Sequence, residues 1–376
     1  MTRRAVAVTL LAVLVAGCSG PIFANPPLVP VAPATPTAGP ARPPDPIPIS
    51  FPRDDGPHDR LTEWWYYTGH LRDGEGARWG FEFVIFRAER GGFPVSWASH
   101  VALTDETAGT FVDDQRSEIG PQVDVSPDSG LDLIVGPSPT LADAWRMQSI
   151  EAIKYHVAAQ SAEFGIRLDL VDTRPAPVLH RGNGWVDFGP AGGSYYYSRP
   201  RMTASGTLTL GQWPQRQELA VEGTAWFDHQ WGDFISVGGG GWDWFAVNLD
   251  DGTDLTISLV RAADGSYPLV YGTIVDADGR ATHLDRGDFE LEADPSRTWT
   301  SPSTGATYPA GWTIRVPGQA LVIDLEPTVA GQELDTRPTT GVVYWEGSQV
   351  VRATRNGRPV GGEAYVELTG YAPAGQ

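Results

Sequence analysis

The amino-acid sequence predicts a mainly β protein, a barrel or sandwich of many short antiparallel strands. Short runs alternate between apolar and polar residues, and turn-forming residues separate them about every 8–12 positions. The runs are Trp79–Phe86, Leu131–Val135, Gly165–Leu170, Gly206–Leu210, Leu255–Leu259, Leu321–Leu325 and Ala364–Leu368. Turn dipeptides typical of hairpins lie between such runs, at Asp251-Gly252, Asp264-Gly265 and Asn356-Gly357. The one segment that predicts a helix is Asp143 to Lys154.

Chain length indicates two domains. After the first fifty residues about 325 remain, which is more than one hydrophobic core normally supports. The tetraglycine Gly238–Gly241 lies near the middle of this part and is followed by a strand-like segment that begins at Trp242. A phosphate-binding loop would need a helix there, so we interpret the glycines as the crossover between two lobes. The expected domains are residues 51–234 and 235–376.

The N-terminus predicts export. Arg3 and Arg4 precede an apolar stretch from Ala5 to Ala16, which is too short to span a bilayer comfortably and is typical of a signal peptide. The segment Val15–Cys18 resembles the lipobox of bacterial lipoproteins, and Cys18 is the only cysteine of the chain. We therefore expect a signal peptide over residues 1–17 and an extracytoplasmic lipoprotein held to the membrane by acyl chains on Cys18.

Residues 21–50 contain eleven prolines and almost no charge. Such a composition cannot bury enough apolar surface to order itself. We expect residues 18–50 to be the lipidated cysteine plus a disordered Pro-rich linker, with the folded part starting near Phe51.

Charge and missing motifs exclude several function classes. The net charge is −19, which makes nucleic acid an unfavourable partner, and nothing in the sequence indicates a protein partner. No G-x-S-x-G, H-E-x-x-H or Walker-type motif occurs, and the seven histidines are scattered without ligand spacing. The sequence therefore predicts neither a cofactor nor a metal site.

Two aromatic segments combine acids and indoles on strand faces. In Glu63–His70, the side chains of Glu63, Trp65 and Tyr67 alternate with those of Trp64, Tyr66 and His70. In Trp226–Asp233, the side chains of Trp226, Asp228 and Gln230 alternate with those of Phe227, His229 and Trp231. One face of each strand would line a cavity for a small hydrophobic ligand.

A carboxyl group among indole rings is desolvated, so its pKa rises and it can serve as a general acid near neutrality. Indole and phenol faces can also stabilise a carbocation formed on an alkene. This pattern favours protonation of an isoprenoid-type double bond. The alternative is that the aromatic residues are ordinary core and that Asp228 and Glu63 only accept hydrogen bonds.

Four ordered motifs resemble the AttH-like family, which includes hydroxyneurosporene synthase, also called carotenoid 1,2-hydratase. They are Glu63–His70, Asp228–Gly232, Trp242-x-Trp244-Phe245, and the pair Tyr344–Gly347 and Gly362–Tyr371. The resemblance implies two packed lipocalin-like barrels with a ligand cavity between or within them. It also implies hydration of an isoprenoid double bond without a redox cofactor, whereas fungal relatives include pericyclases. Asp228 matches the proposed proton donor of the family, and His229 matches its neighbour.

Three functions remain open at this stage. The first is a cofactor-independent hydratase or isomerase of a hydrophobic alkene, with Asp228 as acid and His229 orienting it or activating water. The second is a lipocalin-like lipoprotein that binds or carries a lipid without chemistry. The third is a carbohydrate-active enzyme that uses Glu63 and Asp228 as its carboxyl pair. The residues expected to line the ligand pocket are Glu63, Trp65, Tyr67, Trp226, Trp231, Trp242 and Trp244.

Overall fold

The computed structural model of the chain describes residues 44–136, 144–212, 214–234 and 239–372. The predicted signal peptide and Cys18 lie outside these ranges. Within them, no helix has the length and apolarity to cross a membrane. The described chain is mostly strand, with five short 3₁₀ turns, η1 (Arg53–Asp55), η2 (Pro121–Val123), η3 (His180–Gly182), η4 (Gly189–Ala191) and η5 (Pro317–Gln319).

The first sheet contains the strands up to β12 and has the order β4-β3-β2-β1-β12-β11-β8-β7-β6-β5, with β9 and β10 pairing with β11. Its strands are β1 (Thr62–Asp73), β2 (Arg78–Ala88), β3 (Ser96–Asp105), β4 (Thr110–Ile119), β5 (Asp132–Val135), β6 (Trp145–Glu151), β7 (Lys154–Gln160), β8 (Phe164–Asp172), β9 (Val178–Leu179), β10 (Trp185–Asp187), β11 (Gly193–Leu210) and β12 (Gln217–Gly232).

This sheet curls until its two edges meet. Strand β5 contacts β3 and β4, and two polar bonds link β4 to the other end of the sheet, at the residue after β5 and at the last residue of β7. Gly136 N donates to Glu118 Oε2 at 2.9 Å, and Arg116 Nη2 donates to the Gln160 carbonyl at 3.0 Å. Alternate side chains of each strand point inward, so Trp65, Tyr67 and Phe83 are fully buried inside the barrel.

The second sheet has the order β16-β15-β14-β13-β25-β23-β21-β20-β17, with β22 and β24 pairing with β23 and a separate hairpin β18–β19. Its strands are β13 (Gly239–Leu249), β14 (Asp254–Ala262), β15 (Leu269–Val275), β16 (Ala281–Asp285), β17 (Glu290–Ala293), β18 (Thr298–Thr300), β19 (Thr307–Pro309), β20 (Trp312–Val316), β21 (Leu321–Pro327), β22 (Glu333–Asp335), β23 (Val343–Arg355), β24 (Arg358–Val360) and β25 (Gly362–Thr369). It encloses its own core around Phe245, Trp312 and Trp345.

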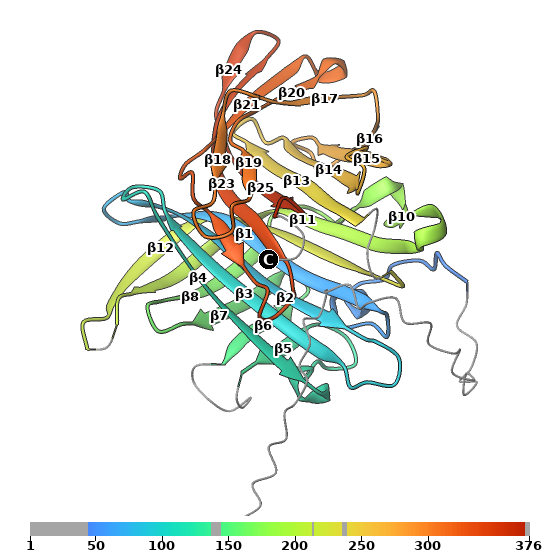
Figure 1. The fold of residues 1–376 in the computed structure, drawn as a ribbon, viewed down its shortest axis with the longest axis vertical. Coiled ribbons are helices and arrows are strands. Elements are labelled where there is room, and N and C mark those ends of the chain that lie inside the picture. Colours follow the sequence, from blue (N-terminus) through green and yellow to red (C-terminus); the bar gives the residue numbers. More distant parts are fainter. Residues whose placement is uncertain (1–43, 137–143, 213, 235–238, 373–376) are drawn as a thin grey trace, which may run out of the picture.

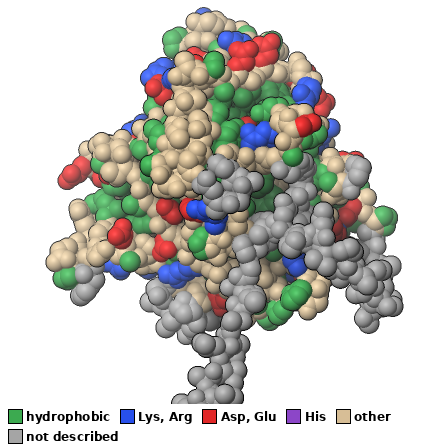
Figure 2. Space-filling view, viewed as in Figure 1, with side chains coloured by type: hydrophobic (Ala, Val, Ile, Leu, Met, Phe, Trp, Pro, Cys, Tyr) green, Lys and Arg blue, Asp and Glu red, His purple; other side chains and the backbone are tan. Residues whose placement is uncertain are grey.

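The two barrels pack side by side, with the first sheet below the second in the view of Figure 1. Strands β1, β2 and β11 of the first contact β25, β23 and β13 of the second. A third apolar cluster, which includes Tyr66, Trp226, Trp244 and Tyr365, fills the space between them. The outward faces of these strands are therefore buried by the other barrel rather than exposed to water. On the described part of the face in Figure 2, acidic and basic side chains are interspersed.

The strand predictions and the hairpin turns are confirmed, whereas the helix prediction at Asp143–Lys154 is wrong. Residues 145–151 form β6, and Lys154 begins β7. Trp145 and Met147 point into the barrel and are fully buried, while Arg146 and Gln148 are partly exposed. The burial thus has the period of two of a strand, and the paired sheet overrides the local helix tendency.

The folded part starts earlier than Phe51. Ile47 and Ile49 pack against the first core, and Ile47 N donates to Tyr195 Oη at 2.7 Å. Asp45 pairs with Arg60, with 2.6 Å between Oδ1 and Nη2. The end of the Pro-rich segment is therefore attached to the first barrel, which corrects the expectation that all of residues 18–50 are a free linker.

Candidate active site between the two barrels

Asp228 lies on the outer face of β12, where the second barrel covers it, and only 4% of its surface is exposed. Its carboxylate accepts three hydrogen bonds. Trp226 Nε1 donates to Oδ1 at 2.7 Å, Tyr196 Oη donates to Oδ2 at 2.5 Å, and Ser198 Oγ donates to Oδ1. The register explains this convergence, because Ser198 on β11 pairs with Asp228 and Trp226 lies two residues away on the same face.

A second layer of side chains fixes these donors. Trp244 Nε1 of β13 donates to Tyr196 Oη at 3.1 Å, and the His180 ring stacks on Tyr196 with 3.8 Å between ring centroids. His180 Nε2 lies 2.7 Å from Ser198 Oγ, and its Nδ1 lies 3.0 Å from Thr273 Oγ1. The Ser198 hydroxyl donates its hydrogen to Asp228, so the Ser198 oxygen accepts a hydrogen bond from His180 Nε2–H. The other ring nitrogen, His180 Nδ1, then accepts a hydrogen bond from the Thr273 hydroxyl. Burial lowers the pKa of His180 to about 3, so the ring is neutral.

Burial raises the pKa of Asp228 from 3.8 to about 6, against the hydrogen bonds from Ser198, Tyr196 and Trp226, which favour the ionised form. At neutral pH this carboxyl is mostly ionised and takes up a proton easily. A group whose pKa lies near the working pH is suited to transfer protons in both directions.

Three further carboxyl groups lie between the barrels, the buried Glu82 of β2 and Glu346 of β23 and the half-buried Glu367 of β25. Tyr66 Oη donates to Glu346 Oε1 at 2.7 Å, and Tyr344 Oη donates to Glu82 Oε1 at 2.9 Å. The other oxygen of Glu82 and of Glu346 has no hydrogen-bond partner among the described residues.

Burial raises the pKa of these three groups as well. It reaches about 8 for Glu82 and about 7 for Glu367, where the Asp228 charge adds to the effect. The pKa of Glu346 is raised well above its usual value by burial and then by the Glu367 and Glu82 charges. Burial and the neighbouring acids therefore favour the protonated form of Glu346, whereas Asp228, with a pKa of about 6, is mostly ionised at neutral pH. A pair of acids with separated pKa values is a common arrangement for acid–base catalysis.

The structure divides the predicted pocket residues into two groups. Asp228, Trp226 and Trp244 lie between the barrels, and Trp242 lies at the rim of this space with 37% of its surface exposed. The residues Glu63, Trp65, Tyr67, Trp231 and His229 point into the first barrel instead. Asp228 and His229 are adjacent in sequence and thus on opposite faces of β12, so His229 does not contact Asp228. Glu63 and Asp228 are separated by the same sheet and cannot flank one glycosidic bond.

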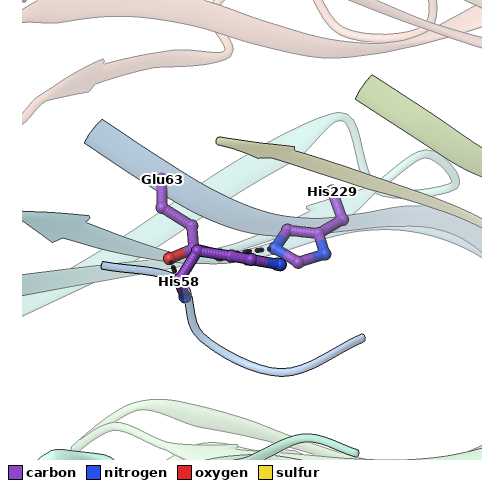
Figure 3. A group of neighbouring side chains, drawn as sticks. All are labelled: His58, Glu63 and His229. Carbon is purple, nitrogen blue, oxygen red and sulfur yellow. Dashed lines mark hydrogen bonds and ion pairs between the residues drawn. The ribbon is translucent and has the colours of Figure 1, made fainter. Parts of the chain in front are cut away.

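The inner group gathers around a buried carboxylate (Figure 3). Glu63 Oε1 lies 2.7 Å from His58 Nδ1 and 2.9 Å from His229 Nε2. Burial favours the neutral form of Glu63, but the neighbouring His58 and His229 outweigh it and lower the Glu63 pKa. These three side chains have the atoms and the spacing to hold a metal ion.

Sequence reasoning missed the partners of Asp228 and the three glutamates. Tyr196 belongs to a run of tyrosines at 195–197, which reads as apolar core, and Ser198 directly follows that run. Glu346 and Glu367 lie within the motifs that carry the family resemblance, so their position was a usable signal. His58 precedes β1 in a loop, and no periodicity marks it.

A separate cavity of about 350 Å³ lies at one end of the first barrel. Trp79, Leu103, Phe164 and Leu210 form its apolar wall, and Asp105 and Glu163 lie at the same site. None of the predicted pocket residues lines it.

The AttH-like family model matches residues 41–371, which is nearly the whole described chain. This chain belongs to the AttH-like family. The crystal structure of a Nitrosomonas europaea protein assigned as AttH is 31% identical, covers 87% of this chain and 98% of that one, and superposes with a TM-score of 0.74. The predicted pair of lipocalin-like barrels is therefore confirmed.

More distant relatives of this AttH-like chain bear enzyme names. The crystal structure of kievitone hydratase from Nectria haematococca is 17% identical, covers 86% of this chain and 93% of that one, and has a TM-score of 0.67. Dehydratase asqC of Emericella nidulans is 25% identical over 183 residues, which are 46% of this chain. The match spans about half the length of that enzyme, 49%.

Proposed function

We propose that this AttH-like chain is a cofactor-independent hydratase, dehydratase or isomerase that moves a proton on a hydrophobic alkene. The observation that carries the proposal is the Asp228 carboxylate, buried between the barrels with a pKa of about 6 and held by three donors. The names of the hydratase and dehydratase relatives support the reaction class.

Asp228 and Glu346 are the proton-transfer pair of this proposal. Tyr66 lies opposite Asp228 in the β1–β12 register, and its hydroxyl donates to Glu346, so both carboxyls border the same tyrosine. In dehydration, ionised Asp228 takes the proton from a carbon next to the carbinol. Protonated Glu346 gives its proton to the departing hydroxyl, which leaves as water while the C–C double bond forms. Hydration is the reverse, with protonated Asp228 as the donor to carbon.

The aromatic side chains packed around Asp228 suit a reaction with a cationic transition state. Trp226 and Trp244 meet edge to face with 6.0 Å between ring centroids, and Tyr66 meets Trp244 in the same way at 5.3 Å. Aromatic faces attract positive charge most strongly where water is excluded. Polyene or isoprenoid alkenes fit this chemistry.

The test is isotope exchange in heavy water with a panel of polyenes, isoprenoid alkenes and the matching alcohols, read by mass spectrometry. Wild-type protein should incorporate deuterium at carbon, and Asp228→Asn should lower the rate by about 10²-fold or more, as for loss of a general acid or base. Asp243→Asn is the matched control. Asp243 is also buried with a pKa near 6, but it is bound to Tyr371 and lies beside Arg261. Equal effects of the two substitutions, or no exchange with any substrate, would refute the assignment.

The cavity at the end of the first barrel favours a second function, the binding of a lipid without chemistry. A fluorescent polyene that binds there should lose affinity in Phe164→Ala and keep it in Trp226→Ala. A ligand between the barrels should give the opposite pattern. The two outcomes separate a carrier from an enzyme that uses Asp228.

Export and anchoring complete the proposal. The basic residues, the apolar stretch and Cys18 support a lipoprotein on the extracytoplasmic side of a membrane. Cys18→Ala should move the protein out of the washed membrane fraction or leave it as an uncleaved precursor. Unchanged fractionation and processing would contradict the anchor.

A further inference from the structure

We propose that His58, Glu63 and His229 form a binding site for a divalent metal ion of the zinc type inside the first barrel. The candidate ligand atoms, one from each residue, all lie within 4.8 Å of one another. Figure 3 shows the two imidazole rings turned toward the Glu63 carboxylate. Two imidazole nitrogens and one carboxylate oxygen make a ligand set found in zinc enzymes, in which a water completes the tetrahedron.

The outer nitrogens of both rings are placed to keep a proton while the inner nitrogens bind a metal ion. The outer nitrogen of each ring faces an acceptor. His58 Nε2 lies 3.3 Å from Asp54 Oδ1, and His229 Nδ1 lies 3.3 Å from Tyr197 Oη. The Tyr197 hydroxyl donates to Asp55 at 2.6 Å, so its oxygen is free to accept from His229.

Without a metal ion the inner nitrogens lie at hydrogen-bond distance from Glu63 Oε1, 2.7 Å for His58 Nδ1 and 2.9 Å for His229 Nε2, so protons on these nitrogens can be donated to the carboxylate. A bound metal ion would take the place of these inner protons, and each ring would then keep its proton on the outer nitrogen. Metal-bound histidines almost always donate their other N–H to a carboxylate, carbonyl or water, which fixes the ring and raises its basicity. Asp54, and Tyr197 supported by Asp55, occupy these supporting positions.

The ligands are held by rigid neighbours. Glu63 on β1 pairs with Trp231 on β12, and His229 pairs with Trp65, so two ligands lie on adjacent strands of the sheet. The His58 ring stacks on Trp231 at 4.1 Å and within 2° of parallel. Trp65 stacks on His229 at 4.7 Å. Such packing fixes side-chain rotamers, which metal sites require.

One side of the site remains accessible. Glu63 and His229 are fully buried, but His58 lies in the loop before β1 and 19% of its side chain is exposed. A metal ion can therefore enter past His58 and retain a water or an anionic ligand group there.

This site lies on the opposite face of β12 from Asp228, and the two tests are therefore independent. Loss of metal binding leaves the proton-transfer site in place, and Asp228→Asn leaves the three metal ligands in place. The metal-site proposal therefore does not depend on the proposed reaction.

The experiment uses the untagged folded chain, stripped with EDTA and titrated with Zn²⁺ by calorimetry and with Co²⁺ by visible absorption. Wild type should bind one equivalent of Zn²⁺, and Co²⁺ should give the strong visible bands of a four-coordinate site. His58→Asn and Glu63→Gln should each weaken binding by about 100-fold or more, since even supporting residues cost 10–100-fold. Zn²⁺ should also raise the unfolding temperature of wild type but not of His58→Asn.

His70→Asn is the matched control, because His70 is buried against Glu106 without a second histidine. It should bind Zn²⁺ as wild type does. If Glu63→Gln does not fold, His58→Asn alone tests the site, because His58 lies in a loop and its replacement should not prevent folding. If wild type binds neither Zn²⁺ nor Co²⁺ stoichiometrically, the three residues form only a His58–Glu63 ion pair and its hydrogen bonds. Binding that survives His58→Asn would place the metal elsewhere, and either result overturns the proposal.

Discussion

Replacing Asp254 by Asn should loosen the attachment of one barrel to the other. Asp254 begins β14 in the second sheet and is fully buried. Two arginines of the first barrel reach it. Arg174 donates to Oδ2 from Nε at 2.9 Å and also from Nη2, and Arg201 Nε donates to Oδ1 at 2.9 Å. Asn at this position keeps the shape but removes the charge that both guanidinium groups face.

The expected loss is about 3–5 kcal/mol, the usual cost of removing one partner of a buried ion pair. Arg174 is only 8% exposed, so water cannot replace the lost carboxylate. Its donation to the Gly252 carbonyl at 2.7 Å persists and makes the lower end of this range the better expectation. Such a loss is a large part of the 5–15 kcal/mol that holds a typical domain folded.

Urea unfolding followed by tryptophan fluorescence measures this loss. Asp251→Asn is the matched control, because Asp251 lies in the same turn but pairs with Arg355 at 2.7 Å with 30% of its side chain exposed. An exposed pair contributes about 1 kcal/mol or less. If Asp254→Asn costs no more than Asp251→Asn, the buried charges do not hold the barrels together and the reasoning fails.

Two further predictions concern pH and the N-terminal segment. Burial raises the pKa of Glu82 from 4.5 to about 8, so between these values the folded state keeps a proton that the unfolded state has lost. Stability should fall as pH rises through this window, by up to about 1.4 kcal/mol per unit from this group. Glu82→Gln should flatten the slope of urea midpoints between pH 6 and 8, and an unchanged slope would refute the shift. Removing residues 1–43 should leave the unfolding temperature unchanged, whereas removing residues 1–50 should lower it by several degrees, because Asp45, Ile47 and Ile49 go with it. Equal unfolding temperatures for the two truncations would contradict these contacts.

The strands could be predicted because burial in a barrel imposes a period of two on the sequence. Asn356 and Gly357 both have positive φ, 51° and 74°, as the tight hairpin turn between β23 and β24 requires. The same periodicity failed at Trp145–Glu151, where a short amphipathic stretch fits a helix nearly as well as a strand. Only the pairing with β5 and β7 decides between them.

The glutamates between the barrels could not be predicted from periodicity. In β2, β23 and β25 the polar residue of each alternation reads as a solvent-facing position, which is correct for an isolated barrel. Packing of the two barrels covers those faces, so Glu82 and Glu346 are buried and Glu367 is half-buried. Such burial depends on how the two sheets pack against each other, and the sequence of a single strand does not reveal it.

The placement of Asp228 and His229 could be read from the sequence, because neighbouring residues of a strand point to opposite faces. A mechanism in which His229 orients Asp228 conflicts with that rule, and the structure gives each residue its own partners. Asp228 meets Ser198, Tyr196 and Trp226 between the barrels, and His229 meets Glu63 inside the first one. One strand therefore supports two chemically different sites, and a motif that spans both faces of a strand must be divided by face before roles are assigned to its residues.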